Sequence, residues 1–355
     1  MNNFIPLKVL TDISNYKRTI IMKIRFKRFL LLFTGIIMML SLSTYVKAQT
    51  TVPGSEIIGK WNITVTIEDE AMENLGLFRH GLYADDEGFP AWLDVKLSGF
   101  STLVGRFVGY EGSARPISEV KYDAENETYS FSIPPQWMNI DEDLYFEMSI
   151  ENDILEGYFI LDGNQLNFTG VRAPSLTREE PPVWGNPKNL LDDNLSSWVI
   201  PNNNQFRMVD GILVNQAVGG NMVTKEEFDD FKLSVEFKLP EGSNSGIYLR
   251  GRYELQIEDI ESITSDISIG GIYGFIAPAV DVPRSADEWQ SYEVTLVGRH
   301  VTVVHNGIEV ISNRPIPGIT GGSLNSNEGE PGPIMIQGDH GPIEFRKFTV
   351  TPALN

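Results

Sequence analysis

The sequence predicts an all-β protein, and three observations support this fold class. Short apolar runs of strand length, separated by Gly, Asn, Asp and Pro, continue from Trp61 to Pro352. Apolar and polar residues alternate within them, as in residues 61–67, where every second residue from Trp61 is apolar. After the first 48 residues, no stretch keeps a 3.6-residue period over three helical turns. Strands are therefore the expected building elements.

A proline-rich stretch divides the chain into two expected domains. Pro174, Pro181 and Pro182 lie between residues 172 and 186, and proline resists both helices and central strands. We therefore expect an N-terminal domain at 49–176, a linker at 177–186 and a C-terminal domain at 187–355. The 307 residues after position 48 are enough for two hydrophobic cores.

The N-terminal domain opens with Gly59, Lys60 and Trp61, which resembles the Gly-x-Trp start of lipocalin-like barrels. Strand-length runs with glycines at the expected bends follow, and suit a meander of six to eight strands. A small β-barrel or sandwich is the expected fold here. No residue of this domain is a catalytic candidate.

The N-terminus is typical of a secretory signal peptide. A basic stretch at 23–28 precedes a 14-residue apolar run at 29–42, and Val46-Lys47-Ala48 then offers a small-residue cleavage site. The run is shorter than a membrane-spanning helix requires. We expect residues 1–48 to be removed, with Met22 as the true start, and the mature chain to be periplasmic or extracellular. Because the sequence has no cysteine, a lipid-anchored form and disulfides are both excluded.

The net charge of the mature chain limits the classes of partner that it is expected to bind. Residues 1–48 hold 8 of the 28 basic residues and one of the 48 acidic residues, which leaves a formal charge of −27. Such a surface repels nucleic acid and anionic membranes. We expect neither as a partner once the signal is removed, and neutral ligands such as sugars remain by elimination.

Two neighbouring runs of the C-terminal domain carry polar residues in strand alternation. Residues 244–250 read Asn-Ser-Gly-Ile-Tyr-Leu-Arg, and residues 253–259 read Tyr-Glu-Leu-Gln-Ile-Glu-Asp. Successive side chains of a strand point to opposite faces. If the two runs pair as a hairpin, one face carries the following four residues: Tyr248, Arg250, Glu254 and Gln256.

Further motifs follow in order: Tyr-Gly at 273–274, Glu-Trp-Gln-Ser-Tyr-Glu-Val at 288–294, Asn-Gly at 306–307, and a polar cluster within 332–348. Together with the two runs, they resemble the 3-keto-disaccharide hydrolase domain family over roughly residues 184–352. The resemblance implies a concanavalin A-like jelly-roll sandwich that acts on an oligosaccharide or glycoside whose C3 hydroxyl has been oxidised to a ketone.

The resemblance also implies roles for residues. A C3 ketone acidifies the proton on C2, so the group on C1 can leave by elimination and water can add to the enone. This requires a base, an acid and a donor for the enolate oxygen. Glu254 is the candidate base, Arg250 the candidate enolate stabiliser, and His340 the alternative acid or base. The candidate substrate-binding residues are Tyr248, Gln256, Tyr273, Gln337, Asp339 and Trp289.

The chain departs from the family pattern beside His340. Gln337-Gly338-Asp339-His340 has one residue more between Gln and His than the usual Gln-x-His. The resemblance implies no certain cofactor. Asp339 and Asp259 leave a divalent cation such as calcium open as a cofactor, although no Asp-rich loop has the spacing of a calcium site.

Other interpretations remain open. A Glu and an Arg across a hairpin often form only an ion pair. The aromatic residues equally suit a non-catalytic, lectin-like domain. Glu254 and Glu258 resemble the Glu-x-Asp-x-Glu strand of jelly-roll β-glucanases, but Gln256 replaces the central Asp. Their Cα atoms would lie about 13 Å apart at about 3.3 Å per residue, whereas a retaining pair of carboxyl groups needs about 5 Å.

The signal-peptide pattern makes a direct prediction. Expressed in a bacterial host, the chain should be recovered outside the cytoplasm with Gln49 or a near neighbour at its N-terminus, because cleavage follows the small residue Ala48. Amino-terminal sequencing of the purified protein checks this. Recovery of cytosolic protein that retains Met22 would contradict it.

Overall fold

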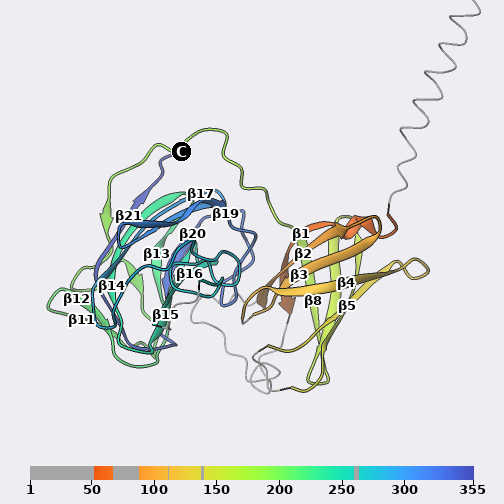
Figure 1. Ribbon diagram of the computed structural model, residues 1–355, viewed down its shortest axis with the longest axis horizontal. Coiled ribbons are helices and arrows are strands. Elements are labelled where there is room, and N and C mark those ends of the chain that lie inside the picture. The colour runs from red at the N-terminus through yellow and green to blue at the C-terminus, as the bar shows by residue number, and fades with distance from the viewer. Residues whose placement is uncertain (1–51, 67–87, 111, 137–139, 260–263) are drawn as a thin grey trace, which may run out of the picture. The chain divides into compact units, whose positions relative to one another are not determined.

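The computed structural model describes residues 52–66, 88–110, 112–136, 140–259 and 264–355. The predicted signal peptide lies outside these residues. The described chain is almost entirely strands, which form one closed barrel and two further sheets (Figure 1). This confirms the predicted all-β class. No helix of the described residues is long and apolar enough to cross a membrane.

The N-terminal region is a closed barrel of eight antiparallel strands, each paired with its neighbours in the sequence. The first strand closes the barrel by pairing with the second and with the last. Trp61, Ile63 and Val65 of that first strand alternate into the buried core, as the sequence pattern predicts. The strands are β1 Gly59–Thr66, β2 Phe89–Ser98, β3 Thr102–Val108, β4 Arg115–Asp123, β5 Thr128–Ile133, β6 Leu144–Glu151, β7 Ile154–Leu161 and β8 Asn164–Arg172.

The C-terminal region is a sandwich of two antiparallel sheets. In spatial order, the smaller sheet contains β10 Trp198–Val199, β13 Met222–Phe228, β20 Gly332–Ile336, β15 Asn244–Leu249 and β16 Tyr253–Glu258. The larger sheet contains β11 Phe206–Val209, β12 Ile212–Asn215, β21 Ile343–Pro352, β14 Phe231–Lys238, β17 Gln290–Val297, β18 His300–His305 and β19 Ile308–Pro315, with β9 Lys188–Asn189 beside β21.

The two sheets share one hydrophobic core. Alternate residues of β14, from Phe231 to Phe237, enter it from the larger sheet. Ile247 of β15 and Leu255 and Ile257 of β16 enter it from the smaller sheet. Each such side chain contributes roughly 1.5–3 kcal/mol when fully buried. The opposite face of β15 and β16 is therefore left for other uses.

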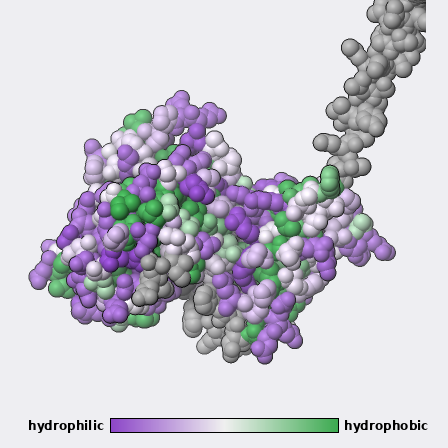
Figure 2. Space-filling view, in the orientation of Figure 1, coloured by the Kyte–Doolittle hydropathy of each residue, from purple (hydrophilic) through white to green (hydrophobic). Residues whose placement is uncertain are grey.

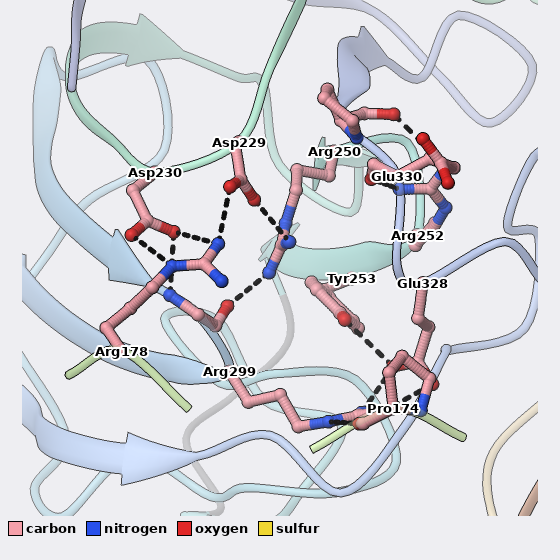
Figure 3. A network of polar contacts seen from close by, with 12 residues as sticks. Pro174, Arg178, Asp229, Asp230, Arg250, Arg252, Tyr253, Arg299, Glu328 and Glu330 are labelled. Carbon is pink, nitrogen blue, oxygen red and sulfur yellow. Dashed lines mark hydrogen bonds and ion pairs between the residues drawn. The ribbon is translucent and has the colours of Figure 1, made fainter. Parts of the chain in front are cut away.

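The connection between barrel and sandwich is held to the sandwich by charged side chains (Figure 3). Arg178 donates hydrogen bonds of 2.7 and 2.9 Å to the carboxylate of Asp230 and one of 2.6 Å to Asp229. Arg299 donates a 2.9 Å hydrogen bond to the carbonyl of Pro174. The predicted linker, 177–186, lies between β8 and β9 and contains Arg178.

The face of the molecule shown in Figure 2 is largely hydrophilic. The face shown in Figure 2 carries many hydrophilic side chains, with hydrophobic ones in smaller groups between them. Such a surface needs no further explanation, since more than half of a typical folded surface is apolar.

The linker contacts predict a specific loss of stability. Asp230 is 3% exposed, so Arg178→Ala leaves a buried carboxylate without its cation. Breaking a buried ion pair costs about 3 kcal/mol, and the partly exposed Arg178 sets a somewhat smaller cost of about 2 kcal/mol. Urea unfolding of the full chain should show a lower midpoint. Lys188→Ala, which breaks an exposed pair with Glu226, is the control and should change the free energy of unfolding by less than 1 kcal/mol. Equal midpoint shifts in both variants would contradict this role for Arg178.

Candidate functional site

The β15–β16 hairpin places polar side chains on the sheet face that points away from the core. Tyr248 lies opposite Glu254, and Gly246 lies opposite Gln256. Because Ile247 and Leu255 are in the main core, their neighbours Tyr248 and Glu254 point to the other face. This is the alternation expected from the sequence.

This polar face is covered rather than open. Val223, Leu324 and Met335 pack with Tyr248 into a small hydrophobic cluster separate from the main core. Glu254 is 5% exposed. A carboxyl group in such a place is costly to ionise, since burial removes water from its charge.

Glu254 belongs to a hydrogen-bonded group centred on Tyr248. The Tyr248 hydroxyl lies 3.0 Å from Glu254 Oε2 and 2.9 Å from the carbonyl oxygen of Gly321. The side-chain amide of Gln337 donates a 3.2 Å hydrogen bond to the same hydroxyl. A hydroxyl has one hydrogen and here two acceptors. The hydroxyl hydrogen can therefore be donated to Glu254 or to Gly321, but not to both at once.

The electrostatics agree with this arrangement. Burial raises the pKa of Glu254 from its ordinary 4.5 to about 8, against the opposing hydrogen bond from Tyr248 and the nearby His340. Burial, followed by the charge of Glu254, raises the pKa of Tyr248 well above its usual value. Glu254 thus exchanges its proton near neutral pH, the range that suits a general acid or base.

Gly246 makes room for the carboxyl group. A Cβ atom at this position would lie 2.6 Å from Glu254 Oε1 and 2.9 Å from Gln337 Oε1. Two acceptor oxygens therefore converge above one glycine. Gln337 Oε1 is buried without a hydrogen-bond partner among the described residues. A ligand hydroxyl that donates at this point would satisfy it.

Asp339 and His340 lie near the same carboxyl group. Asp339 Oδ1 is 2.7 Å from His340 Nδ1, and Asn221 donates a 3.2 Å hydrogen bond to Asp339 Oδ2. The charges of both residues act on Glu254, His340 lowering its pKa and Asp339 raising it. The His340 side chain is 44% exposed, whereas Glu254 is buried. The additional residue before His340 does not remove it from the vicinity of Glu254.

Three further expected residues lie along the same strand and its neighbour loop. Burial, then Glu254 and Glu258, raises the pKa of the half-buried Tyr273 to about 12. Burial raises the pKa of Glu258 to about 7, against the charge of Arg284. Gln256 is buried, and its Oε1 accepts a hydrogen bond from the backbone of Ile257. The side-chain oxygen of Gln256 is thus already hydrogen-bonded within its own strand.

Arg250 is not brought to Glu254, which corrects the expected face. Strand β15 ends at Leu249, and Arg250 has a left-handed backbone with φ of 53° that breaks the alternation. Its guanidinium donates to Asp229 and to the carbonyl of Gly298, and lies 5.4 Å from the centre of the Tyr253 ring, which belongs to the main core (Figure 3). Arg250 therefore stabilises the end of the hairpin and is not a candidate enolate stabiliser.

Trp289 is also placed elsewhere. Its ring lies 4.5 Å from the Arg346 guanidinium carbon and 5.3 Å from Lys238 Nζ, so it stacks with cations of the larger sheet.

As for metals, the described residues contain no cluster of three or more His, Asp and Glu side chains that could hold an ion.

Sequence reasoning missed Gly246 and the 320–324 segment as parts of the site. Gly322 has φ of 73°, and a Cβ there would lie 2.4 Å from the Tyr248 hydroxyl. Thr320 Oγ1 accepts a hydrogen bond from the backbone of Glu254. The signal was present as two adjacent glycines at 321–322, but their contact with Tyr248 depends on the fold.

Known proteins resemble the chain in its C-terminal half. The family model described as the 3-keto-alpha-glucoside-1,2-lyase-like domain matches residues 186–351. No curated protein matches the chain. Because the family match begins at residue 186, it gives no support to the expected lipocalin resemblance of the barrel.

Several solved structures are similar. Two are candidate glycosyl hydrolases from Parabacteroides distasonis. The first is 25% identical, covers 49% of this chain and 92% of its own, and has a TM-score of 0.42. The second is 24% identical, covers 47% and 98%, and has a TM-score of 0.38. A sialidase from Trypanosoma rangeli is 12% identical and covers 74% and 60%, with a TM-score of 0.33. The family match and the quoted motifs agree over the same segment, so residues 186–351 of this chain are similar to the 3-keto-alpha-glucoside-1,2-lyase-like domain family.

Proposed function

We propose that the C-terminal domain cleaves 3-keto-glycosides by elimination, with Glu254 as the base that removes the C2 proton. The family match over residues 186–351 supports a carbohydrate-active domain in this half of the chain. The observation that carries the proposal is the buried Glu254 carboxyl group, whose pKa of about 8 suits proton transfer near neutral pH.

The reaction balances without a cofactor. The C2–H bond breaks, its proton passes to Glu254, and its electrons form an enolate with the C3 ketone. The enolate then forms the C1=C2 bond while the C1–O bond breaks, so the leaving oxygen takes that electron pair and needs a proton. Addition of water across the enone, with OH at C1 and H at C2, completes a net hydrolysis.

The residues around Glu254 suit the remaining roles. His340 is the proposed acid for the leaving oxygen, because it lies at the exposed side of the site and Asp339 holds its Nδ1 at 2.7 Å. Its Nε2 is then the nitrogen that protonates the leaving group. Since Arg250 lies elsewhere, the proposed donor to the enolate oxygen is the Tyr273 hydroxyl. The charge of Glu254 contributes to the raised pKa of Tyr273, so the two groups interact electrostatically.

Gln337 and Gly246 supply the binding part of the proposal. The unpartnered Gln337 Oε1 above Gly246 would accept a hydrogen bond from a sugar hydroxyl. A donor bound there would lie beside Glu254 Oε1, so substrate binding and proton transfer use adjacent oxygens. Gln256 and Tyr248 form the supporting wall of this site.

Glu254→Gln should separate catalysis from binding. The amide keeps the shape of the carboxyl group but cannot accept the C2 proton, so turnover of a 4-nitrophenyl 3-keto-α-glucoside should fall about 100-fold or more, with KM little changed. Nitrophenolate release and enone absorbance measure both steps.

Glu258→Gln is the matched control on the same face of the strand. It should lower turnover by less than 10-fold, because elimination needs one base, whereas a retaining glycosidase needs both carboxyl groups. Retention of deuterium at C2 in the hydrolysed sugar, or a near-normal rate for Glu254→Gln, would contradict the proposed base. Equal cleavage of the unoxidised glucoside would favour the β-glucanase interpretation, and no cleavage of either would favour the lectin-like one.

The pKa of Glu254 predicts the pH dependence. The base acts only when ionised, so kcat/KM should fall about 10-fold per pH unit below the pKa of about 8. Tyr248→Phe removes the hydrogen bond that holds this pKa down, so the acid limb should move to higher pH. Pre-steady-state rates from pH 5 to 10 check both points. An unmoved limb in Tyr248→Phe would show that a different group titrates.

A further inference from the structure

The barrel contains a cavity at one end, remote in sequence from the proposed active site. Its volume is about 60 Å³. Side chains from seven of the eight barrel strands line it, and most are apolar, among them Phe107, Phe146, Phe159 and Leu166. A water molecule needs roughly 10–15 Å³ of such space, and an engineered cavity of about 150 Å³ binds benzene. The barrel cavity therefore has room for about four to six non-hydrogen atoms.

One charged side chain lines this apolar cavity. Arg115, the first residue of β4, is 8% exposed. It donates a 3.0 Å hydrogen bond to the carbonyl of Pro134, and its guanidinium carbon lies 5.7 Å from the centre of the Phe107 ring. Its Nε is buried without a hydrogen-bond partner in the described part of the chain.

Arg115 lacks the kind of ion pair that two other buried arginines form. Arg299 is paired with Glu328, and Arg250 with Asp229. None of the ion pairs found among the described residues involves Arg115. Burial alone lowers the pKa of Arg115 to about 10, which still leaves it charged at neutral pH. A desolvated cation without a counter-ion is costly, and an anion that binds beside it would offset this cost.

Gln136 adds a second unsatisfied polar atom to the same cavity. Its amide donates a 2.8 Å hydrogen bond to Ser113, but its Oε1 is buried without a partner among the described residues. Buried polar atoms are nearly always hydrogen-bonded in folded proteins. Gln136 Oε1 needs a donor, whereas Arg115 Nε needs an acceptor, so the anionic end of a ligand belongs on Arg115 and not on Gln136.

We propose that the barrel binds a short-chain aliphatic carboxylate, with its carboxylate on Arg115 and its alkyl chain against Phe107, Phe146 and Leu166. The guanidinium matches a carboxylate in charge and in planar geometry, and Nε is one of the donors that face such a pair. The cavity volume limits the alkyl chain to about two to four carbons. This site is independent of the function proposed for the sandwich.

Calorimetric titration of the full chain with propionate tests the proposal. We expect saturable binding of one propionate per chain, at least 10-fold weaker binding of 1-propanol, which has the same chain without the charge, and at least 10-fold weaker binding of chloride, which has the charge without the chain. Arg115→Met keeps the side-chain volume, removes the charge and should abolish propionate binding. Lys121→Met, an exposed cation of the same strand, is the control and should bind normally.

Two additional variants keep the test decisive. Arg115→Lys retains the charge but not the planar donors, so it should bind propionate at least 10-fold more weakly even if Arg115→Met does not fold. Ala91→Leu adds bulk to the cavity wall and should weaken propionate binding similarly. Binding of propionate and 1-propanol with equal affinity, binding of chloride as tight as that of propionate, or normal binding by Arg115→Lys and Ala91→Leu together would overturn the proposal.

Discussion

The burial of one carboxyl group, that of Glu254, constrains the rest of the active face. Gly246 leaves space for it, Tyr248 hydrogen bonds to it, and Gly322 lets the covering segment approach Tyr248. The arrangement costs stability at neutral pH. Since the pKa of Glu254 rises from 4.5 to about 8 on folding, its contribution to stability is complete below pH 4.5 and is lost as the pH rises through 8. The proposed base is thus maintained at a cost in folding stability.

Ion pairs and hydrogen bonds hold the turn of the same hairpin. Arg250 turns away from the active face because its backbone is left-handed, and there it binds Asp229 and the Gly298 carbonyl. In Figure 3, Arg178 joins this group through Asp229 and Asp230, and Arg299 donates a hydrogen bond to the carbonyl of Pro174. Tyr253, at the start of β16, donates a 2.8 Å hydrogen bond to Glu328. Strands β15 and β16, which carry Tyr248 and Glu254, are therefore held in place by contacts outside the proposed active site.

The sequence was sufficient for features that follow from local alternation. The period of two predicts that Ile247 and Leu255 are buried in the core and that Tyr248 and Glu254 share the other face, as the structure has them. It fails where the backbone departs from a strand or where the sheet must be known. The φ of Arg250 reverses its side chain, and Trp289 stacks in the other sheet. Neither can be read from spacing, because each depends on contacts between residues far apart in the sequence.

Buried charge in this chain falls into two groups that differ in their consequence. Arg299 with Glu328 and Arg178 with Asp230 are neutralised by partners within the chain, so their folded environment is already complete. Within the part of the chain that the structure describes, Glu254 and Arg115 have no ion-pair partner of opposite charge, and burial shifts the pKa of each toward its neutral form. An internal partner would have been the more stable solution at either position. For these two groups we propose that the partner is a ligand: the acidic C2–H of a 3-keto sugar for Glu254 and a carboxylate for Arg115.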